Sequence, residues 1–340
     1  MTDKVSLLIG GDICPIGVAI ESFVKGDAQS IFRDLLPEFE RADFSIVNLE
    51  CPLIEEASPI VKSGPVFGIP VSCIKGLVNS HIDAVNLANN HILDHGGKGV
   101  LSTLEACEAA EMLHVGAGKN LKQAGRLLVR DIRGTKVAFA GMAEHEFSIA
   151  GEDSPGANPI DPIEFCRTVR MRDKEYDYLV VLLHAGYQHY AYPSPGLQKL
   201  CRFMVEEGAN AVICQHSHCP GCYEIYRGAP VVYGQGNLID ESPSHSMSWH
   251  TGFLVKLSLE HHAAAIQMEI VPYLQSWQQS GAHRMHPREE IAFREELESR
   301  SQEILEEKQV EKLWNEFCLL QKSRYLSDLH GHGRFLRGLN

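Results

Sequence analysis

The sequence predicts an α/β fold. From the N-terminus to about residue 230, short runs of β-branched and apolar residues alternate with stretches that have helical spacing. Beyond residue 230, strand-like runs follow one another without helices between them. Alternation of this kind is typical of α/β proteins with largely buried sheets. The later runs predict an antiparallel or mixed portion of a second sheet.

The individual elements follow from the same patterns. Helical spacing predicts helices near residues 31–41, 99–110 and 197–207, and in the second of these Leu101, Leu104 and Ala109 share one face. Apolar runs predict strands at residues 5–9, 44–48, 84–87, 136–141, 178–183, 211–214, 231–233, 252–259 and 264–272.

The C-terminal part has a different character. Residues 288–325 predict one or two charged amphipathic helices, with Ile304, Val310, Leu313 and Phe317 on one stripe. Two interpretations are open: a helical appendage packed on the core, or a helix that binds a partner. We therefore predict one domain over residues 1–275 and a C-terminal helical extension over residues 276–340, whose Gly-rich tail is expected to be loose.

The composition restricts the function. A chain of 340 residues with 44% hydrophobic content can bury a full core. Its formal net charge of −13 disfavours nucleic-acid binding, which needs clustered Lys and Arg. The apolar run at residues 5–9 is too short for a signal peptide or a membrane span, so we expect no membrane partner and a cytoplasmic location. The ten scattered cysteines are expected to be reduced, mostly in the core.

Polar residues at predicted strand ends carry the chemistry. Asp12, Glu50, the pair Asn90 and His91, His184 and His216 each follow a predicted strand. A single histidine beside an apolar run is usually a satisfied core or surface residue. In α/β sheets, however, the carboxyl ends of strands open into one crevice, so five such ends together indicate a site.

The residue types indicate a metal. Carboxylate, carboxamide and imidazole groups together bind Zn, Mn or Fe. His216 and His218 are two residues apart, so on a loop both rings can face the same side and reach two ions. Two-metal sites activate water and stabilise the leaving oxygen in phosphoryl transfer. A further histidine that is not a ligand could protonate the leaving group.

Five segments, in order, carry a resemblance to a known family: GGDICPIG, ADFSIVNLECPL, VNLANNHILDHG, HAGYQHYAYPSP and EEGANAVICQHSHCPGCYEIYRGAPVVYGQGNLID. Together they resemble the CapA-type capsule and poly-γ-glutamate synthesis proteins, which belong to the calcineurin-like metallophosphatase superfamily. The resemblance covers about residues 5–272. It implies a four-layer α/β/β/α sandwich, two mixed sheets flanked by helices.

The resemblance also implies roles for the strand-end residues. His91 resembles the general acid, and Asp94 could orient it through a hydrogen bond. The implied cofactor is one or two divalent transition-metal ions (Mn, Zn or Fe). The implied ligands are Asp12 and His218 for the first metal, Asn90, His184 and His216 for the second, and Glu50 as the bridging carboxylate.

The chain departs from the family pattern at several positions. Cys14 stands where the wider superfamily has a histidine, and it is either a thiolate ligand or a core thiol. In HAGYQHY, Gln188 replaces a glutamate and His189 an aromatic residue, which predicts different substrate handling. The membrane anchor of many relatives is absent, which favours a soluble phosphoesterase or a biosynthetic enzyme over a role in capsule export.

Four further residues have alternative interpretations. Cys219 and Cys222 form one C-x-x-C motif, which is either structural or a peripheral metal or redox site. Lys62 and Arg227 are expected near the strand-end face. They either bind a substrate anion or are solvated surface cations. His189 is a further candidate for substrate binding.

Three functions remain open. The first is a metal-dependent phosphoesterase acting on a small phosphorylated, carboxylate-rich or peptide-like anionic substrate. The second is a non-hydrolytic protein of a poly-γ-glutamate or peptide-bond-forming system, with an ATP-dependent ligase as partner. The third is a binding module with a degenerate site, which the retained ligand set disfavours. No oligomeric state is predicted.

Overall fold

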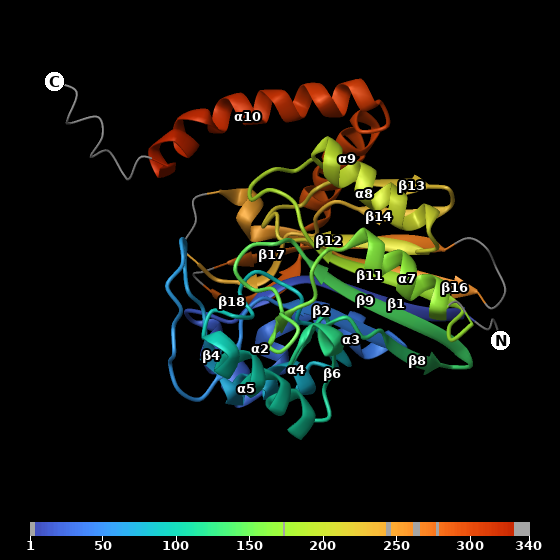
Figure 1. The fold of residues 1–340 in the computed structure, drawn as a ribbon. Helices are drawn as coiled ribbons and strands as arrows, with labels where there is room; N and C mark the ends of the chain where they lie inside the picture. Colours follow the sequence, from blue (N-terminus) through green and yellow to red (C-terminus); the bar gives the residue numbers. More distant parts are fainter. Residues whose placement is uncertain (1–3, 173, 243–245, 261–265, 277–278, 330–340) are drawn as a thin grey trace.

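Two large β-sheets and their flanking helices make up the protein (Figure 1). The structure is a computed structural model that describes residues 4–172, 174–242, 246–260, 266–276 and 279–329, without the side chains of residues 276, 279, 324, 325 and 327–329. The predicted α/β class is confirmed. The Gly-rich tail and the first two residues of the strand predicted at 264–272 lie outside the described residues.

The first sheet has eight strands in the order β18-β17-β16-β1-β2-β5-β6, with β15 also paired to β1. β1, β2, β5 and β6 are parallel, whereas β16, β17 and β18 are antiparallel. The runs predicted at 252–259 and 264–272 are antiparallel as expected, but they extend the sheet of β1 and do not belong to a second sheet. The run predicted at 231–233 lies in the other sheet, in a parallel pairing. The strands are β1 (Lys4–Cys14), β2 (Phe44–Leu49), β5 (Ala84–Asn86), β6 (Leu113–Val115), β15 (Asn237–Asp240), β16 (Thr251–Glu260), β17 (Gln267–Ser276) and β18 (Gln279–Arg284).

The second sheet has six strands in the order β13-β14-β12-β11-β9-β8. Its four central strands, β14, β12, β11 and β9, are parallel, and the edge strands β13 and β8 are antiparallel to their neighbours. The strands are β8 (Leu128–Ile132), β9 (Thr135–Ala143), β11 (Tyr178–His184), β12 (Ala211–Gln215), β13 (Tyr223–Tyr226) and β14 (Ala229–Val232). Strands β3 (Leu53–Ile54) with β4 (Ile69–Pro70), and β7 (Ala117–Gly118) with β10 (Gly156–Ala157), form two small pairs.

Alternating side chains divide the interior into three apolar cores. In β1, Leu7 and Ile9 belong to the same core as Val180 and Leu182 of β11, which places this core between the two sheets. Leu8 points to the other face, into a core shared with helices of the first sheet. Successive residues of a strand point to opposite faces, so both sheets are buried on both sides.

Helices cover the two outer faces. The first sheet is covered by α1 (Ala19–Lys25), α2 (Ala28–Phe32), α3 (Leu36–Arg41), α4 (Ile74–Asn79) and α5 (Gly96–Ala109). The second is covered by α7 (Pro162–Arg172) and α8 (Pro195–Glu206), and α6 (Leu121–Ala124) lies beside β7 and β10.

The helix predicted over residues 31–41 is wrong as a single element. It is divided into α2, the 3-10 turn η1 (Arg33–Leu35) and α3. Arg33 has φ of 45°, outside the helical region, and Pro37 lies at the start of α3. Proline has no N–H to donate within a helix but fits its first turn, so the chain restarts a helix there.

The C-terminal helices are α9 (Pro287–Glu303) and α10 (Glu307–Leu329). Phe293 and Leu297 of α9 join the core between the sheets, which supports the packed-appendage interpretation for this helix. α10 lies beside α8 at one edge of the molecule (Figure 1). Its Phe317 stacks on Tyr190, which precedes α8, at 4.3 Å between ring centroids. The boundary predicted at residue 275 falls inside β17, because the sheet continues through β18 to Arg284.

Within the described residues, every helix is too short or too polar to cross a bilayer.

Candidate metal centre

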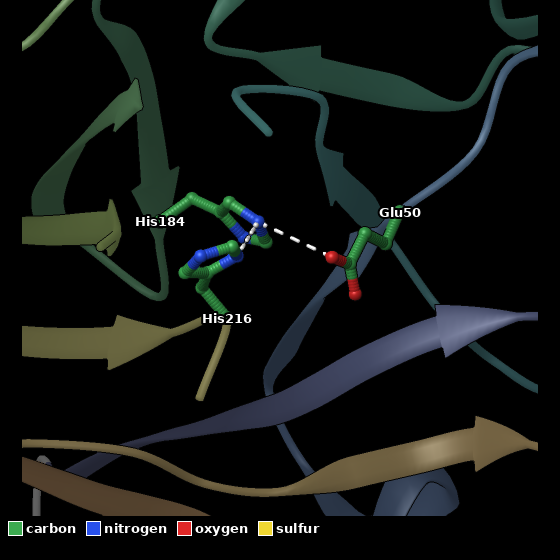
Figure 2. A group of neighbouring side chains, drawn as sticks. All are labelled: Glu50, His184 and His216. Atoms are coloured by element: carbon green, nitrogen blue, oxygen red, sulfur yellow. Dashed lines mark hydrogen bonds and ion pairs between the residues drawn. The ribbon is translucent and has the colours of Figure 1, made fainter. Parts of the chain in front are cut away.

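The two sheets bring the predicted ligands together at one end of their parallel strands. Glu50 directly follows β2, His184 is the last residue of β11, and His216 directly follows β12. Asp12 lies inside β1, which continues to Cys14 beyond the predicted end at Ile9. Carboxyl ends of parallel strands share one edge, so a carboxylate from the first sheet meets imidazoles from the second, as Figure 2 shows for Glu50, His184 and His216.

The first group of ligand atoms surrounds Nε2 of His184. This atom lies 3.0 Å from Oδ1 of Asn90, 3.1 Å from Nδ1 of His216 and 3.3 Å from Oε1 of Glu50. All four side chains are buried. Glu50, His184 and His216 alone already offer three ligand atoms within 4.8 Å of one another.

The second group shares Glu50 with the first. His218 lies with Nε2 3.8 Å from Oε1 of Glu50 and with Nδ1 3.9 Å from Oδ2 of Asp12. Asp12, Glu50 and His218 also offer three ligand atoms within 4.8 Å. The six residues predicted as ligands therefore form two adjacent groups, with Glu50 common to both.

The state of Glu50 tests whether these residues fit a cation. Its Oε1 is buried and has no hydrogen-bond partner among the described residues. Burial, and next the charge of Asp12, raise the pKa of Glu50 well above its ordinary value. A buried carboxylate oxygen without a partner costs free energy, which a bound cation would offset. The donor set fits a divalent transition metal.

The imidazoles are in the state that binds metal. Burial lowers the pKa of His184 to about 4, and burial followed by the charge of His184 lowers the pKa of His216 well below its ordinary value. His218 differs: burial lowers its pKa, but the carboxylates of Glu50 and Asp12 outweigh burial and raise it. Because neutral imidazole is the ligand form, His184 and His216 are ready to bind a metal without losing a proton.

The loop that carries the histidine pair is held in an unfavourable backbone conformation. His216 has φ of 96° and His218 has φ of 53°, in the left-handed region that side chains rarely adopt. The N–H of His216 donates to Oδ2 of Asp12 at 3.1 Å, which fixes this loop against β1. Such residues cost about 1–3 kcal/mol each and are concentrated at functional sites, so the strain supports a role for this loop.

His91 lies beside the first group, and its expected contact with Asp94 is present. Nδ1 of His91 lies 2.7 Å from Oδ2 of Asp94, and the same oxygen accepts the N–H of Phe67 at 2.7 Å. Lys62 forms an ion pair with Asp94 and lies 3.2 Å from Nδ1 of His91. Burial is the main cause that lowers the pKa of His91, which Asp94 opposes.

The structure separates the three residues predicted to bind substrate. The side chain of Lys62 is 2% exposed, so the solvated-cation interpretation is wrong. His189 lies at the rim, where its ring is 5.6 Å from that of Trp249, which is 4.9 Å from His218. Arg227 does not lie near the metal centre. It precedes β14, which runs parallel to β12, so it lies at the opposite end of the sheet, 3.0 Å from Glu206.

Sequence reasoning missed two carboxylates. Glu144 directly follows β9, and Glu146 is two residues further on; together with His216 they form a third group of metal-capable side chains. The positional signal was the same as for Glu50. The strand was predicted to end at Gly141, but β9 continues to Ala143, so the two glutamates were not recognised as strand-end residues.

The cysteines near the site are core thiols. All ten cysteines are free, as expected. The hydrogen bond that the Cys14 thiol makes to Cys51, and then burial, raise the pKa of Cys14 well above its ordinary value, so it is a neutral thiol. Burial raises the pKa of Cys219 to about 11, and Cys222 is also buried. None of these belongs to the metal-capable groups that the described residues form, which favours the structural interpretations.

The fold and site define a class: an α/β protein in which two sheets present a buried, metal-capable cluster of histidines and carboxylates at their strand ends. The family follows from comparison with known proteins. The model of the bacterial capsule synthesis protein family PGA_cap matches residues 6–242, and the chain belongs to this family. The predicted CapA-type resemblance is therefore confirmed.

Curated relatives agree with this assignment. The chain is 26% identical to the capsule biosynthesis protein CapA of Bacillus anthracis over 281 residues, which are 79% of this chain and 67% of that protein. It is 28% identical to the PGA biosynthesis protein CapA of Bacillus subtilis (strain 168) over 70% of this chain and 63% of that protein. It is 26% identical to a probable polyglutamine synthesis accessory protein of Mycobacterium tuberculosis, over 64% of this chain and 60% of that protein.

Among solved structures, the chain resembles protein TT1561 of Thermus thermophilus. The TM-score is 0.42 at 14% identity, and the match covers 78% of this chain and 98% of that chain. A likeness at this level assigns no function.

Proposed function

We propose that the protein is a metal-dependent hydrolase of the phosphoesterase type, with one or two Mn, Zn or Fe ions as cofactor. The observation that carries the proposal is the pair of three-residue groups that share Glu50. Divalent ions held there would lower the pKa of a bound water and stabilise the oxygen of the leaving group. Asp12, Glu50, Asn90, His184, His216 and His218 are the proposed ligands.

The fold is part of the proposal. We infer that the two facing sheets and their outer helices are the four-layer sandwich of the metallophosphatases, with the C-terminal helices as an extension. The three separate cores, one between the sheets and one under each helical layer, support this assignment.

His91 is the proposed general acid, with Asp94 as its positioning residue. Since Nδ1 of His91 faces Asp94, its Nε2 is the nitrogen left to give a proton to the leaving oxygen. The pKa of His91, lowered mainly by burial, makes the protonated ring a stronger acid. Phe67, whose ring lies 4.6 Å from that of His91, helps to keep water away from this step.

The proposed substrate is a small phosphorylated or carboxylate-rich molecule, or a peptide-like anion. Lys62 is the cation nearest to His91, but its charge is shared with Asp94. His189, beside Trp249, is the proposed contact at the rim. Arg227 has no part in this proposed substrate site, because it lies at the opposite end of the second sheet.

The test is metal analysis followed by hydrolysis of an aryl phosphate ester. The reconstituted protein is expected to bind one or two ions and to release phosphate. His91→Ala should remove most of the turnover without loss of bound metal, and the matched variant His114→Ala, at a partly buried histidine of β6, should not. Absence of bound metal after reconstitution would overturn the proposal.

A non-hydrolytic role is the second candidate. Relatives are described as biosynthesis proteins or as a synthesis accessory protein, and Lys62, the cation nearest to His91, is paired with Asp94. In this case the site would bind an acyl phosphate or a polymer end for an ATP-dependent ligase. Metal binding without phosphoester turnover, together with co-purification of such a ligase, would favour it. Cytoplasmic location stays a prediction.

A further inference from the structure

Each histidine of the metal centre turns one ring nitrogen toward the other ligands and the second nitrogen toward a partner. Nδ1 of His218 donates to Oδ1 of Asn237 at 2.8 Å, and Nε2 faces Glu50. Nδ1 of His184 lies 3.2 Å from the amide of Asn48, and Nε2 is surrounded by the first group. The carboxylate of Asp12 also lies 3.9 Å from Nδ1 of His218 and 4.0 Å from Nδ1 of His184.

His216 is arranged the other way round. Its Nδ1 faces the first group, 3.1 Å from Nε2 of His184, so its Nε2 points away from the ligands. A carboxylate faces this nitrogen: Oε1 of Glu146 lies 3.9 Å from it. Because a ligand that binds through Nδ1 is neutral, its proton must be on Nε2.

We propose that Glu146 is the positioning residue of His216. Its carboxylate accepts the proton on Nε2, fixes the ring so that Nδ1 faces the metal, and raises the basicity of that nitrogen. The 3.9 Å separation is an ion-pair distance, and the side chain of Glu146 is 34% exposed, so it has room to approach. The ligand atoms of the first group also lie closer together than those of the second, so the first group is expected to bind its metal more tightly and to fill first.

The contacts of Glu144 favour the positioning role of Glu146 over a separate cation site. Glu144, Glu146 and His216 could together hold an ion of their own. However, Oε1 of Glu144 already accepts the N–H of Gly186 at 3.2 Å. An ion there would also need the lone pair of Nε2, while the first group uses Nδ1, and a neutral imidazole has one lone pair for both nitrogens.

The experiment measures metal affinity and stoichiometry by titration of the metal-free protein with Zn²⁺ against a chromophoric chelator. Glu146→Gln is expected to weaken the tighter binding step by about 10- to 100-fold and to leave the weaker step and the stoichiometry unchanged. Glu144→Gln should change neither step more than about threefold, since an amide oxygen can still accept from Gly186. The exposed Glu152→Gln is the matched charge control.

Three results would overturn the inference. Unchanged affinity in Glu146→Gln excludes the positioning role. Loss of one bound ion in both Glu144→Gln and Glu146→Gln would assign a separate cation site instead. If metal-free Glu146→Gln melts at a lower temperature, and the stability it has lost accounts for the loss of metal affinity, then Glu146 has a general structural role. The inference depends on the proposed metal centre but not on hydrolysis; if the unmodified protein binds no Zn²⁺, both fail.

Discussion

The two halves of the metal centre differ in how closely their ligands converge. Around His184, three other side chains bring donor atoms to within 3.0–3.3 Å of a single nitrogen. Around His218, two other side chains contribute, at 3.8 and 3.9 Å from its two ring nitrogens. Converged ligands need little rearrangement to bind a metal, so the half around His184 should bind first and more tightly. Glu50, common to both halves, couples them.

The comparison is most severely tested by Glu50→Gln. Removing the shared carboxylate should weaken both metal-binding steps by more than about 100-fold, since even outer partners of a ligand contribute 10- to 100-fold. The metal-free variant should in addition melt at a higher temperature than the metal-free parent, because a buried carboxyl with a raised pKa and an unpartnered oxygen destabilises the fold at neutral pH and a neutral amide does not titrate. Chelator competition and calorimetry measure the two effects. A variant that still binds both ions tightly would contradict the shared role.

Single histidine variants should separate the halves. His184→Ala is expected to abolish the tight step and to leave weak binding at Asp12 and His218, because it removes the nitrogen around which the first group is built. His218→Ala should remove the weak step alone. Isothermal titration with Mn²⁺ resolves the two steps. Equal effects of the two variants would show that the halves do not bind independently.

Asn237→Ala is expected to have a smaller effect, on the half around His218. The amide oxygen of Asn237 accepts the Nδ1 proton of His218 and so directs its Nε2 toward the centre. Losing this partner should weaken the second step by about 10-fold or more. The same titration measures it, with Asn158→Ala, whose amide donates to a backbone carbonyl away from the centre, as control.

The pH dependence of stability gives the smallest effect. The pKa of His184 in the folded protein is lowered to about 4 by burial, whereas an unfolded histidine titrates near 6.5. The unfolded chain therefore binds the proton first, and the metal-free protein should lose stability as pH falls from about 6.5 to about 4. His184→Gln should reduce this loss by a few kcal/mol in urea unfolding. An identical pH profile in the variant would mean that His184 is not buried in the neutral form.

The strand-end residues were predictable because one physical rule governs them. Predicting the site needed only the correct order of strands along the chain, because parallel strands present their carboxyl ends at one edge of a sheet. This rule brings together Asp12, Glu50, Asn90, His184 and His216. Glu144 was missed because the strand boundary was wrong by two residues, at Gly141 instead of Ala143. Boundaries depend on pairing with β11, which no local pattern reveals.

Other features needed the tertiary structure. The burial of Lys62 results from its pairing with Asp94, far from it in sequence. Arg227 was assigned to the wrong end because the direction of β14 follows from its parallel pairing with β12. The break at Arg33 and the continuation of the first sheet through β18 likewise depend on packing, because β18 contacts α2 and the turn that follows it.

The most direct test of the metal centre is anomalous diffraction from crystals grown with Mn²⁺. The structure predicts a peak bounded by Glu50, Asn90, His184 and His216, and at higher concentration a second, weaker peak beside Asp12 and His218. Cys14 should touch neither ion. Crystals that contain Mn²⁺ but show no peak at this cluster, or that show the stronger peak beside His218, would contradict the account.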